Sequence, residues 1–251
     1  MKKIFILFVF YFNFFSISAQ DLNQLTQQAI TYEKQFNEKG ALQKYQEILS
    51  LKPTDISLLV KCTELSCSIG SRQTLLSDKK KYFDQATKYA LQSFNTDSTS
   101  SIANYAQALV YGKLTSIEME NKKIVDYVRL TYVFALRSMI LDANNAKTSY
   151  VLGKWHLEMT NLSWFKRTAV KLFYGGLPEA ENDSAILYME KCKKLDPYFV
   201  LNYLDLAKAY IANNQPAEAN AVLTKMIHLP NRTADDAALK SEGQKLLEQL
   251  Q

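Results

Sequence analysis

The chain has 251 residues, with 30 Lys and Arg against 25 Asp and Glu, and only 7 Gly and 5 Pro. The formal net charge is +5, and it falls to +3 without Lys2 and Lys3, which is too small to indicate a nucleic-acid-binding protein. The length is sufficient for one large domain or a repeat array, and the scarcity of Gly and Pro favours helices over a sheet-rich fold.

Residues 1–19 have the pattern of a secretory signal peptide. Lys2 and Lys3 supply positive charge, the apolar run IFILFVFYFNFF follows, and the small residues of SISA precede the mature chain. We predict cleavage after Ala19 and export to the periplasm or cell envelope, or release into the medium. The apolar run is short for a membrane span and is interrupted by Asn13, so an uncleaved N-terminal anchor is the less favoured alternative.

Residues 20–251 are predicted to form one tetratricopeptide-like repeat domain, because small and large residues recur at the spacings of paired repeat helices. In the first segment these positions are Leu25, Ala29 and Tyr32, followed by Ala41, Tyr45, Ile48 and Pro53. In the last segment they are Tyr203, Leu206, Ala207 and Tyr210, followed by Ala219, Leu223, Met226 and Pro230. Small residues let paired helices approach closely, and large residues fill the gaps that remain.

The cysteine spacing argues against a disulfide framework. Cys62 and Cys67 lie five residues apart on one predicted helix, a rise of roughly 7.5 Å that exceeds the usual reach of a disulfide. We expect these two and Cys192 to be small buried apolar residues. A pairing of Cys192 with either of the others is the alternative.

The ends of the second helices mark the length of each repeat. They recur at Pro53, Ser98, Ala143, Pro197 and Pro230. The intervals are 45, 45, 54 and 33 residues, whereas a tetratricopeptide repeat spans about 34. Repeats two and three therefore need longer helices or turns. Repeat four needs an insertion of about twenty residues between its helices, which we place at residues 162–183.

These spacings predict an all-α solenoid of about five helix pairs, with an inserted helix in repeat four and a C-terminal capping helix. The alanines at the helix crossings should be buried, namely Ala41, Ala86, Ala185 and Ala219. The cap is expected at residues 233–250, with Thr233 as its N-cap and acidic residues in its first turn.

Several motifs resemble the regulator of microtubule dynamics family, whose members carry a tetratricopeptide-like domain. The motifs are LGKW at 152–155, LSW at 162–164, KRTAVKLF at 166–173, Leu177-Pro178, KKLDPYF at 193–199, LAKAYI at 206–211 and LPNRTADDAALKSEGQKLL at 229–247. The resemblance covers roughly Tyr82 to Leu250 and includes the inserted segment. It implies the repeat fold, and animal members are membrane-anchored proteins linked to microtubules, organelle contacts and lipid handling. This chain departs from them at its N-terminus, so the fold carries over better than the cellular role.

The concave surface lined by the first helix of each repeat is the predicted ligand groove. Residues just off the packing positions should point into it, namely Asn104, Gln107, Tyr111, Lys147, Tyr150, Lys154, Leu204, Lys208 and Ile211. Lysine and asparagine beside aromatic and aliphatic surface suit a peptide with a carboxylate, or a lipid with a phosphate. The alternative is that these side chains form only a solvated inner wall.

The inserted segment is predicted to contain a short amphipathic helix. Its candidate residues are Trp164, Phe165, Leu172 and Phe173, with the basic residues on another face. We expect these side chains and Trp155 to pack the helix against the solenoid. A lid over the groove and a contact with a membrane surface are the alternatives.

The sequence contains no metal-ligand spacing, nucleophile elbow or phosphate-binding loop. His156 stands where a repeat helix usually has a Tyr, so we expect it to be packed rather than catalytic. We therefore expect a non-catalytic binding protein without a cofactor, whose partner is a protein or peptide. An anionic lipid or membrane surface is the alternative partner, and no nucleic-acid partner is expected.

Overall fold

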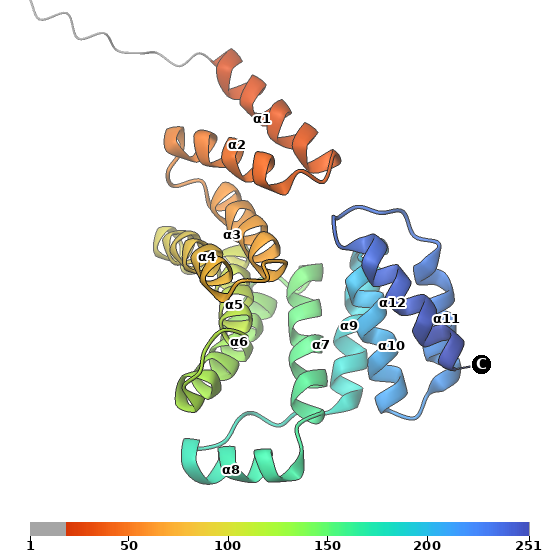
Figure 1. Cartoon of the computed structure of the whole chain (residues 1–251). Coiled ribbons are helices and arrows are strands. Elements are labelled where there is room, and N and C mark those ends of the chain that lie inside the picture. Colours follow the sequence, from red (N-terminus) through yellow and green to blue (C-terminus); the bar gives the residue numbers. More distant parts are fainter. Residues whose placement is uncertain (1–18, 251) are drawn as a thin grey trace, which may run out of the picture.

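The computed structural model describes residues 19–250, and this part of the chain consists of α-helices joined by turns, without β-strands. The helices are α1 (Ala19–Lys34), α2 (Glu38–Leu51), α3 (Ile56–Ser71), α4 (Leu76–Thr96), α5 (Ser101–Leu114), α6 (Asn121–Leu141), α7 (Ala146–Thr160), α8 (Trp164–Tyr174), α9 (Asn182–Leu195), α10 (Val200–Ala212), α11 (Pro216–Ile227) and α12 (Asp236–Gln249) (Figure 1). Within this range no helix is both long and apolar enough to cross a bilayer. The predicted signal peptide lies outside the described residues except for Ala19, so its cleavage remains a prediction.

The helices pack as five successive pairs, which confirms the predicted tetratricopeptide-like solenoid. α1 packs on α2, α3 on α4, α5 on α6, α7 on α9, and α10 on α11. Neighbouring pairs stack into a curved array, and α12 covers the last pair by contacting α10 and α11 (Figure 1). The core follows the array as three clusters of buried side chains, in the first, middle and last repeats.

The alanines predicted at the helix crossings are wholly buried, which confirms the register of the repeats. Their exposed fraction is 0% at Ala41, Ala86, Ala185 and Ala219. Gly153 shows how closely the helices approach, because a Cβ built there would lie 2.6 Å from Met189 Cγ and 3.0 Å from the Ala185 carbonyl oxygen. Any larger residue at this contact would have to displace α9 from α7.

Two long second helices account for the wide intervals of repeats two and three. α4 and α6 have 21 residues each, whereas α2, α9 and α11 have 14, 14 and 12. The extra length of repeat four is the 11-residue helix α8 with its connecting segments, placed between α7 and α9 as predicted.

Local signals at both ends define α8. The Ser163 side chain accepts a hydrogen bond from the backbone N–H three residues later, which caps the first turn. Gly175 and Gly176 follow with φ of 75° and 81°, a left-handed conformation that ends the helix and favours glycine. Arg129 Nη2 of α6 then donates hydrogen bonds to the carbonyl oxygens of Tyr174 at 2.8 Å and Gly176 at 3.0 Å. These bonds fix the end of α8 to the array.

The prediction that apolar side chains pack α8 against the solenoid is wrong. Phe165, Leu172 and Phe173 are 74%, 73% and 76% exposed, so their common face points to solvent. The seam between α6 and α7 is already filled by Trp155, which is buried and donates from its indole N–H to a carbonyl oxygen of α6 at 2.9 Å. The side chain of Trp164 is outside the described set, and its packing remains a prediction.

The capping helix begins three residues later than expected. Its first residue is Asp236, and Thr233 is not its N-cap. The Asp236 carboxylate accepts hydrogen bonds from the Thr233 backbone N–H at 2.9 Å and from the Thr233 hydroxyl at 2.6 Å. Thr233 therefore acts as a donor within the preceding turn, instead of accepting a bond from the first turn of the helix.

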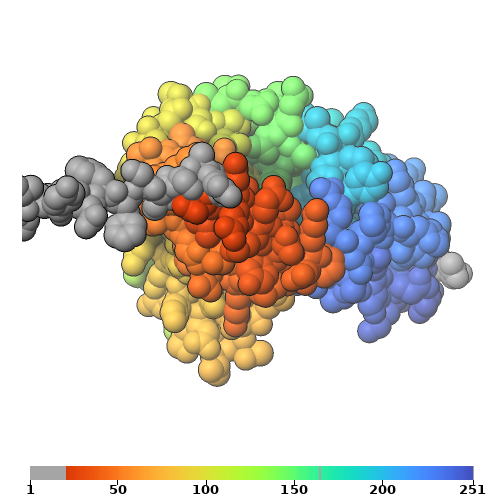
Figure 2. All heavy atoms as spheres, turned by 90° about the horizontal axis from the view of Figure 1, so that it is seen from above, coloured from red at the N-terminus to blue at the C-terminus, as the bar shows by residue number. Residues whose placement is uncertain are grey.

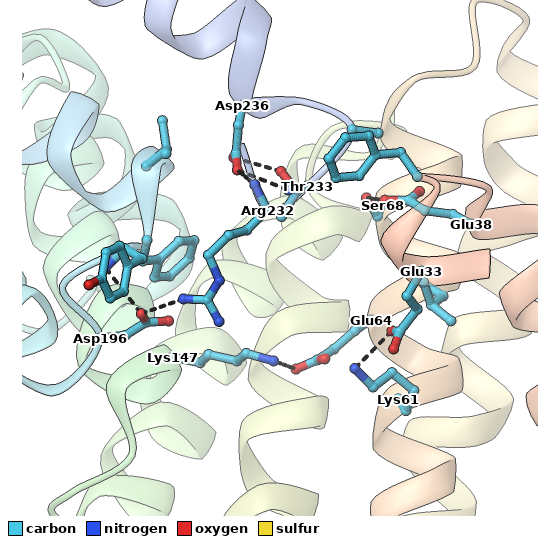
Figure 3. A pocket seen from close by; sticks show the side chains of 16 residues that line it. Glu33, Glu38, Lys61, Glu64, Ser68, Lys147, Asp196, Arg232, Thr233 and Asp236 are labelled. Carbon is cyan, nitrogen blue, oxygen red and sulfur yellow. Dashed lines mark hydrogen bonds and ion pairs between the residues drawn. The ribbon is translucent and has the colours of Figure 1, made fainter. Parts of the chain in front are cut away.

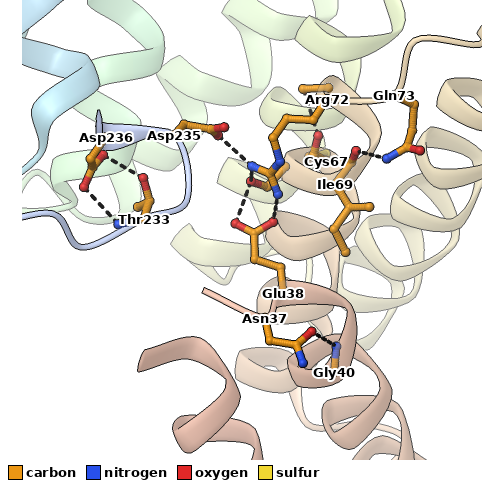
Figure 4. Close-up of polar contacts among 12 residues, drawn as sticks. Asn37, Glu38, Gly40, Cys67, Ile69, Arg72, Gln73, Thr233, Asp235 and Asp236 are labelled. Atoms are coloured by element: carbon orange, nitrogen blue, oxygen red, sulfur yellow. Dashed lines mark hydrogen bonds and ion pairs between the residues drawn. The ribbon is translucent and has the colours of Figure 1, made fainter. Parts of the chain in front are cut away.

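One side chain connects the two ends of the array. Arg72, directly after α3, forms an ion pair with Glu38 at the start of α2 and another, at 2.8 Å, with Asp235 directly before α12 (Figure 4). Seen from above, the first helices lie on the same side of the molecule as the last ones (Figure 2). The curvature of the solenoid therefore brings its two ends close enough for the Arg72 side chain to bridge them.

The three cysteines are free and buried, as expected of small core residues, namely Cys62, Cys67 and Cys192. Burial is the main cause that raises the pKa of each thiol to about 12. The alternative pairing of Cys192 with another cysteine is not formed.

Candidate functional site

Two hollows lie between the helices of the curved array. The first has a volume of about 300 Å³ and lies between α1, α2 and α3 on one side and α7, the α9–α10 turn and the α11–α12 turn on the other (Figure 3). We call it the polar hollow. Its charged lining residues are Glu33, Glu38, Lys61, Glu64, Lys147, Asp196, Arg232 and Asp236.

Ion pairs between repeats neutralise one side of the polar hollow. Lys61 Nζ of α3 lies 3.0 Å from Glu33 Oε1 of α1. Lys147 Nζ of α7 lies 2.6 Å from Glu64 Oε1 of α3. Both cations are therefore occupied by carboxylates of this chain (Figure 3).

The opposite side of the polar hollow is neutralised in the same way. Arg232 Nη1 lies 3.0 Å from Asp196 Oδ1, and its backbone N–H donates to Asp236 Oδ2 at 2.7 Å. Glu38 of α2, on the first side of the hollow, forms an ion pair with Arg72. A ligand in this hollow would have to displace the existing contacts, which disfavours it as a ready-made binding site.

The second hollow is larger and mainly apolar, with a volume of about 490 Å³. It lies between α5, α6 and α7, with further lining from residues around the start of α10. We call it the apolar cavity. Its apolar lining includes Ala108, Leu109, Val128, Val151, Met159 and Leu201. The volume lies within the range of roughly 300–1,000 Å³ that is usual for ligand pockets.

A glycine of α5 forms part of the wall of the apolar cavity. A Cβ built on Gly112 of α5 would come no closer than 3.7 Å to another side chain, that of Thr131. This is ordinary van der Waals contact, in contrast to the overlap at Gly153. Gly112 therefore widens the cavity without being required for helix packing.

A buried carboxylate holds polar side chains beside the cavity. Asp205 of α10 is 1% exposed and accepts a hydrogen bond from the Tyr150 hydroxyl at 2.8 Å. Its oxygens also lie 3.2 Å from Lys154 Nζ and 3.8 Å from Lys208 Nζ. Burial, followed by the charge of Asp205, raises the pKa of Tyr150 well above its usual value. Burial lowers the pKa of Lys154, but Asp205 and Glu158 outweigh this effect, so the net shift of that pKa is upward.

The three lysines of the predicted groove, Lys147, Lys154 and Lys208, are all engaged by carboxylates. Besides the contacts above, Lys154 Nζ lies 2.9 Å from Glu158 Oε1 and Lys208 Nζ lies 2.8 Å from Glu242 Oε1. These lysines form ion pairs within the protein, so none of them offers an unpaired cation to a ligand.

Lys113 differs from the other lysines that line the apolar cavity. It stands in the last turn of α5, next to Gly112. It has no carboxylate partner within residues 19–250, whereas Lys147 and Lys154 are both paired. Its ammonium group is therefore available to an anionic group of a ligand.

The predicted groove residues separate into three groups. Those that line the apolar cavity together are Lys147, Tyr150 and Lys154. Three others lie outside its lining. Tyr111 stacks on Phe134 of α6 with ring centroids 5.7 Å apart, Ile211 packs against the core of the last repeats, and Lys208 contacts the capping helix.

The prediction of a groove position is wrong for the last group, whose side chains are buried, namely Asn104, Gln107 and Leu204. Asn104 Nδ2 donates to the carbonyl oxygens of Ser98 at 2.9 Å and Ser100 at 2.8 Å, so it holds the turn before α5. Leu204 is 1% exposed and belongs to the core of the last repeats. The helices of neighbouring repeats bury positions on these first helices that the periodicity of the sequence had indicated as exposed.

Sequence reasoning missed three residues of this site. Gly112 and Lys113 follow the repeat pattern of α5 and show no local signal of a cavity. Asp205 carries a signal, because a carboxylate within the apolar run VLNYLDLAKAYIA is costly to bury without partners. Its partners Tyr150 and Lys154 come from the preceding repeat.

His156 is packed, as predicted. It is 6% exposed, stacks on Tyr188 with ring centroids 5.7 Å apart, and its Nδ1 accepts a hydrogen bond from the Glu181 backbone N–H at 3.3 Å. Burial lowers the pKa of His156, with Glu181 opposing the shift. Among the described residues, no group of His, Cys, Asp and Glu is arranged to hold a metal ion.

Comparison with known proteins places these observations in a family. Residues 22–251 match the family model described as Regulator of microtubule dynamics protein 1-3. Regulator of microtubule dynamics protein 1 of Caenorhabditis elegans is 25% identical over 187 residues, which cover 74% of this chain and 80% of that protein. Regulator of microtubule dynamics protein 3 of Rattus norvegicus is 26% identical over 172 residues, covering 68% of this chain but 36% of the rat protein.

The fold also has a counterpart among solved structures. A thermophilic TPR protein of Thermus thermophilus superimposes with a TM-score of 0.66, covering 90% of this chain and 99% of that one. The identity of the two sequences is 12%, so the similarity concerns the fold alone.

Proposed function

This chain belongs to the Regulator of microtubule dynamics protein 1-3 family, and we propose that it is a non-catalytic repeat scaffold. Its ligand is a peptide segment that binds in the apolar cavity. The observation that carries the proposal is the combination of apolar walls with one unpaired lysine, Lys113. Repeat arrays commonly bind extended partners on their inner surfaces, which supports a peptide as the ligand.

The chemistry of the cavity favours a peptide with apolar side chains and a carboxylate at one end. Burial of apolar side chains contributes about 25 cal/mol per Å² of surface removed from water. Lys113 can donate a charge-assisted hydrogen bond to a C-terminal carboxylate or an acidic side chain. Lys147 and Lys154 retain their own carboxylates and add no net charge to the site.

Filling the cavity provides the main test. Gly112→Leu adds a side chain to the cavity wall beside Thr131, and removal of a helical glycine stabilises by up to about 1 kcal/mol. We expect an unchanged or raised Tm together with loss of binding. The probes are peptides selected on the full chain from a random library with free C-terminal carboxylates, measured by fluorescence polarisation.

The role of the cation is tested separately with the same peptides. Lys113→Gln should weaken binding by roughly 10- to 100-fold, because a hydrogen bond to a charged group is lost. Lys245→Gln, an exposed lysine of α12, is the matched control and should have no effect. Equal binding by the wild type and Gly112→Leu would contradict the proposed site.

A lipid with an anionic head group is the second candidate ligand. The same cavity favours it, because an acyl chain needs no hydrogen-bond partners and the walls are mainly apolar. Mass spectrometry of organic extracts from the purified full chain separates the candidates. A lipid that copurifies with the wild type but not with Gly112→Leu would favour this ligand, whereas peptide selection without any copurifying lipid would exclude it.

We further propose that the protein acts in the cell envelope after export, based on the signal-peptide pattern of residues 1–19. N-terminal sequencing of the protein from a periplasmic fraction should find Gln20 as the first residue. Met1 retained on protein in the membrane pellet would instead indicate an anchor.

A further inference from the structure

The apolar side chains of α8 form one uncovered face. Phe165, Leu172 and Phe173 follow helical spacing and therefore share a side of the helix. Each exposes about three-quarters of its surface. Large apolar side chains that gather on one surface usually mark an interaction site, because their exposure to water is unfavourable.

The same helix is uniformly basic. Its charged residues are Lys166, Arg167 and Lys171, and no acidic residue occurs between positions 159 and 178. None of the three forms an ion pair within the described part of the chain. Arg167 Nε donates to the Leu162 carbonyl oxygen at 3.0 Å, which leaves its positive charge unneutralised.

α8 lies at one end of the array, where its apolar face can contact a broad surface outside the protein. Figure 1 shows α8 running across one end of the array, beyond the ends of α6 and α7. The hydrogen bonds from Arg129 fix its C-terminal end to α6, and Ser163 caps its N-terminal end. The apolar face is therefore displayed by a fixed helix and not by a loose loop.

We propose that α8 is a membrane-contact helix that docks this scaffold on a bilayer surface containing anionic lipids. Phe165, Leu172 and Phe173 enter the boundary between head groups and acyl chains, as in other interfacial amphipathic helices. The basic side chains remain at the level of the lipid phosphates, to which they are attracted. This contact is separate from ligand binding in the apolar cavity.

Charge favours a membrane over the other occupants of this face. A symmetric dimer through α8 would bring the same basic residues of two copies together, and like charges across an interface are unfavourable. A lid over the apolar cavity would bury the apolar face, whereas its side chains are exposed. An anionic bilayer instead satisfies the apolar face and the positive charge together.

Tryptophan quenching by brominated acyl chains tests the contact in the full chain. The chain has two tryptophans, of which Trp155 is buried and Trp164 is the first residue of α8, so the signal comes from α8 and not from residues 1–19, which contain no tryptophan. We expect quenching by vesicles of brominated phosphatidylcholine with phosphatidylglycerol, and much less without the anionic lipid. Added salt should weaken it.

Substitutions separate the two components of the contact. Combined replacement of Phe165, Leu172 and Phe173 by Ser should reduce vesicle affinity at least about tenfold. Lys166→Gln and Lys171→Gln should each reduce it roughly fivefold on anionic vesicles. All these side chains are exposed, so Tm should be retained. Ile140→Ser is the matched control, because Ile140 of α6 is 76% exposed and lies outside α8.

Three outcomes would overturn the proposal. The first is absence of quenching on anionic vesicles, and the second is equal quenching by the wild type and the triple Ser variant. The third is a dimer, seen by light scattering, that the triple Ser variant loses while neither protein binds vesicles. Unchanged occupancy of the apolar cavity in the triple Ser variant is the expected control result, since the two sites are independent.

Discussion

α8 and α12 are the two helices outside the five repeat pairs, and their apolar side chains meet opposite environments. α12 packs on α10 and α11, and its Leu247 is 6% exposed. α8 contacts α6 and leaves Phe165, Leu172 and Phe173 in solvent. Both helices were expected to cover the array, and only α12 does.

The difference depends on whether an uncovered apolar surface of the array lies next to each helix. α12 follows the last repeat, whose outer surface has no further pair to cover it, so an apolar face there meets an apolar partner. α8 interrupts a pair that is already complete, because α7 packs directly on α9 and Trp155 fills the adjoining seam. An amphipathic pattern therefore predicts a face but does not identify the surface that will cover it.

Truncation of one leucine in each helix should give the largest contrast. Leu247→Ala removes a buried side chain and should lower the free energy of unfolding by about 2–4 kcal/mol. Leu172→Ala removes an exposed side chain and should change it by no more than about 0.5 kcal/mol. Urea denaturation monitored by circular dichroism measures both values. Similar losses in the two variants would show that α8 is packed after all.

A second experiment asks whether the insertion loosens the pair that it interrupts. Gly153→Ala should cost about 1–3 kcal/mol, because the new methyl group overlaps Met189 across the α7–α9 contact. Gly112→Ala on α5, where the new methyl group would make ordinary van der Waals contact with Thr131, should be neutral or stabilise by up to about 1 kcal/mol. Thermal unfolding of the two variants supplies the comparison, and a harmless Gly153→Ala would mean that α7 and α9 are not in tight contact.

The smallest expected effects concern the contacts that hold the two extra helices. Arg129→Gln removes the hydrogen bonds to the end of α8 and should increase hydrogen–deuterium exchange in α8, with little change in Tm. Arg72→Gln removes the partly exposed ion pairs with Glu38 and Asp235 and should cost about 1 kcal/mol, less at high salt. Exchange that stays unchanged in α8 of Arg129→Gln would show that other contacts hold this helix.

The repeat fold was predictable because its determinants are local and recur. Ala41 and Ala219 occupy equivalent crossings, and both are wholly buried. The site was less predictable, because its properties depend on partners from other repeats. Lys154 appears in the sequence as an available cation, yet Asp205 of the next repeat binds it. Phe165 is likewise exposed because the neighbouring apolar surfaces of the array are already covered by other segments.

The ion pairs of Arg72 have a consequence for how the array unfolds. A repeat array with free ends is nearly one-dimensional, and its terminal units fray first. Arg72 links the first two repeats to Asp235, 163 residues away, so fraying at one end breaks a contact with the other. Unfolding of the first repeats and of the capping region is therefore expected to be weakly coupled through this contact. Because this contact is a partly exposed ion pair, added salt should weaken the coupling between the two ends.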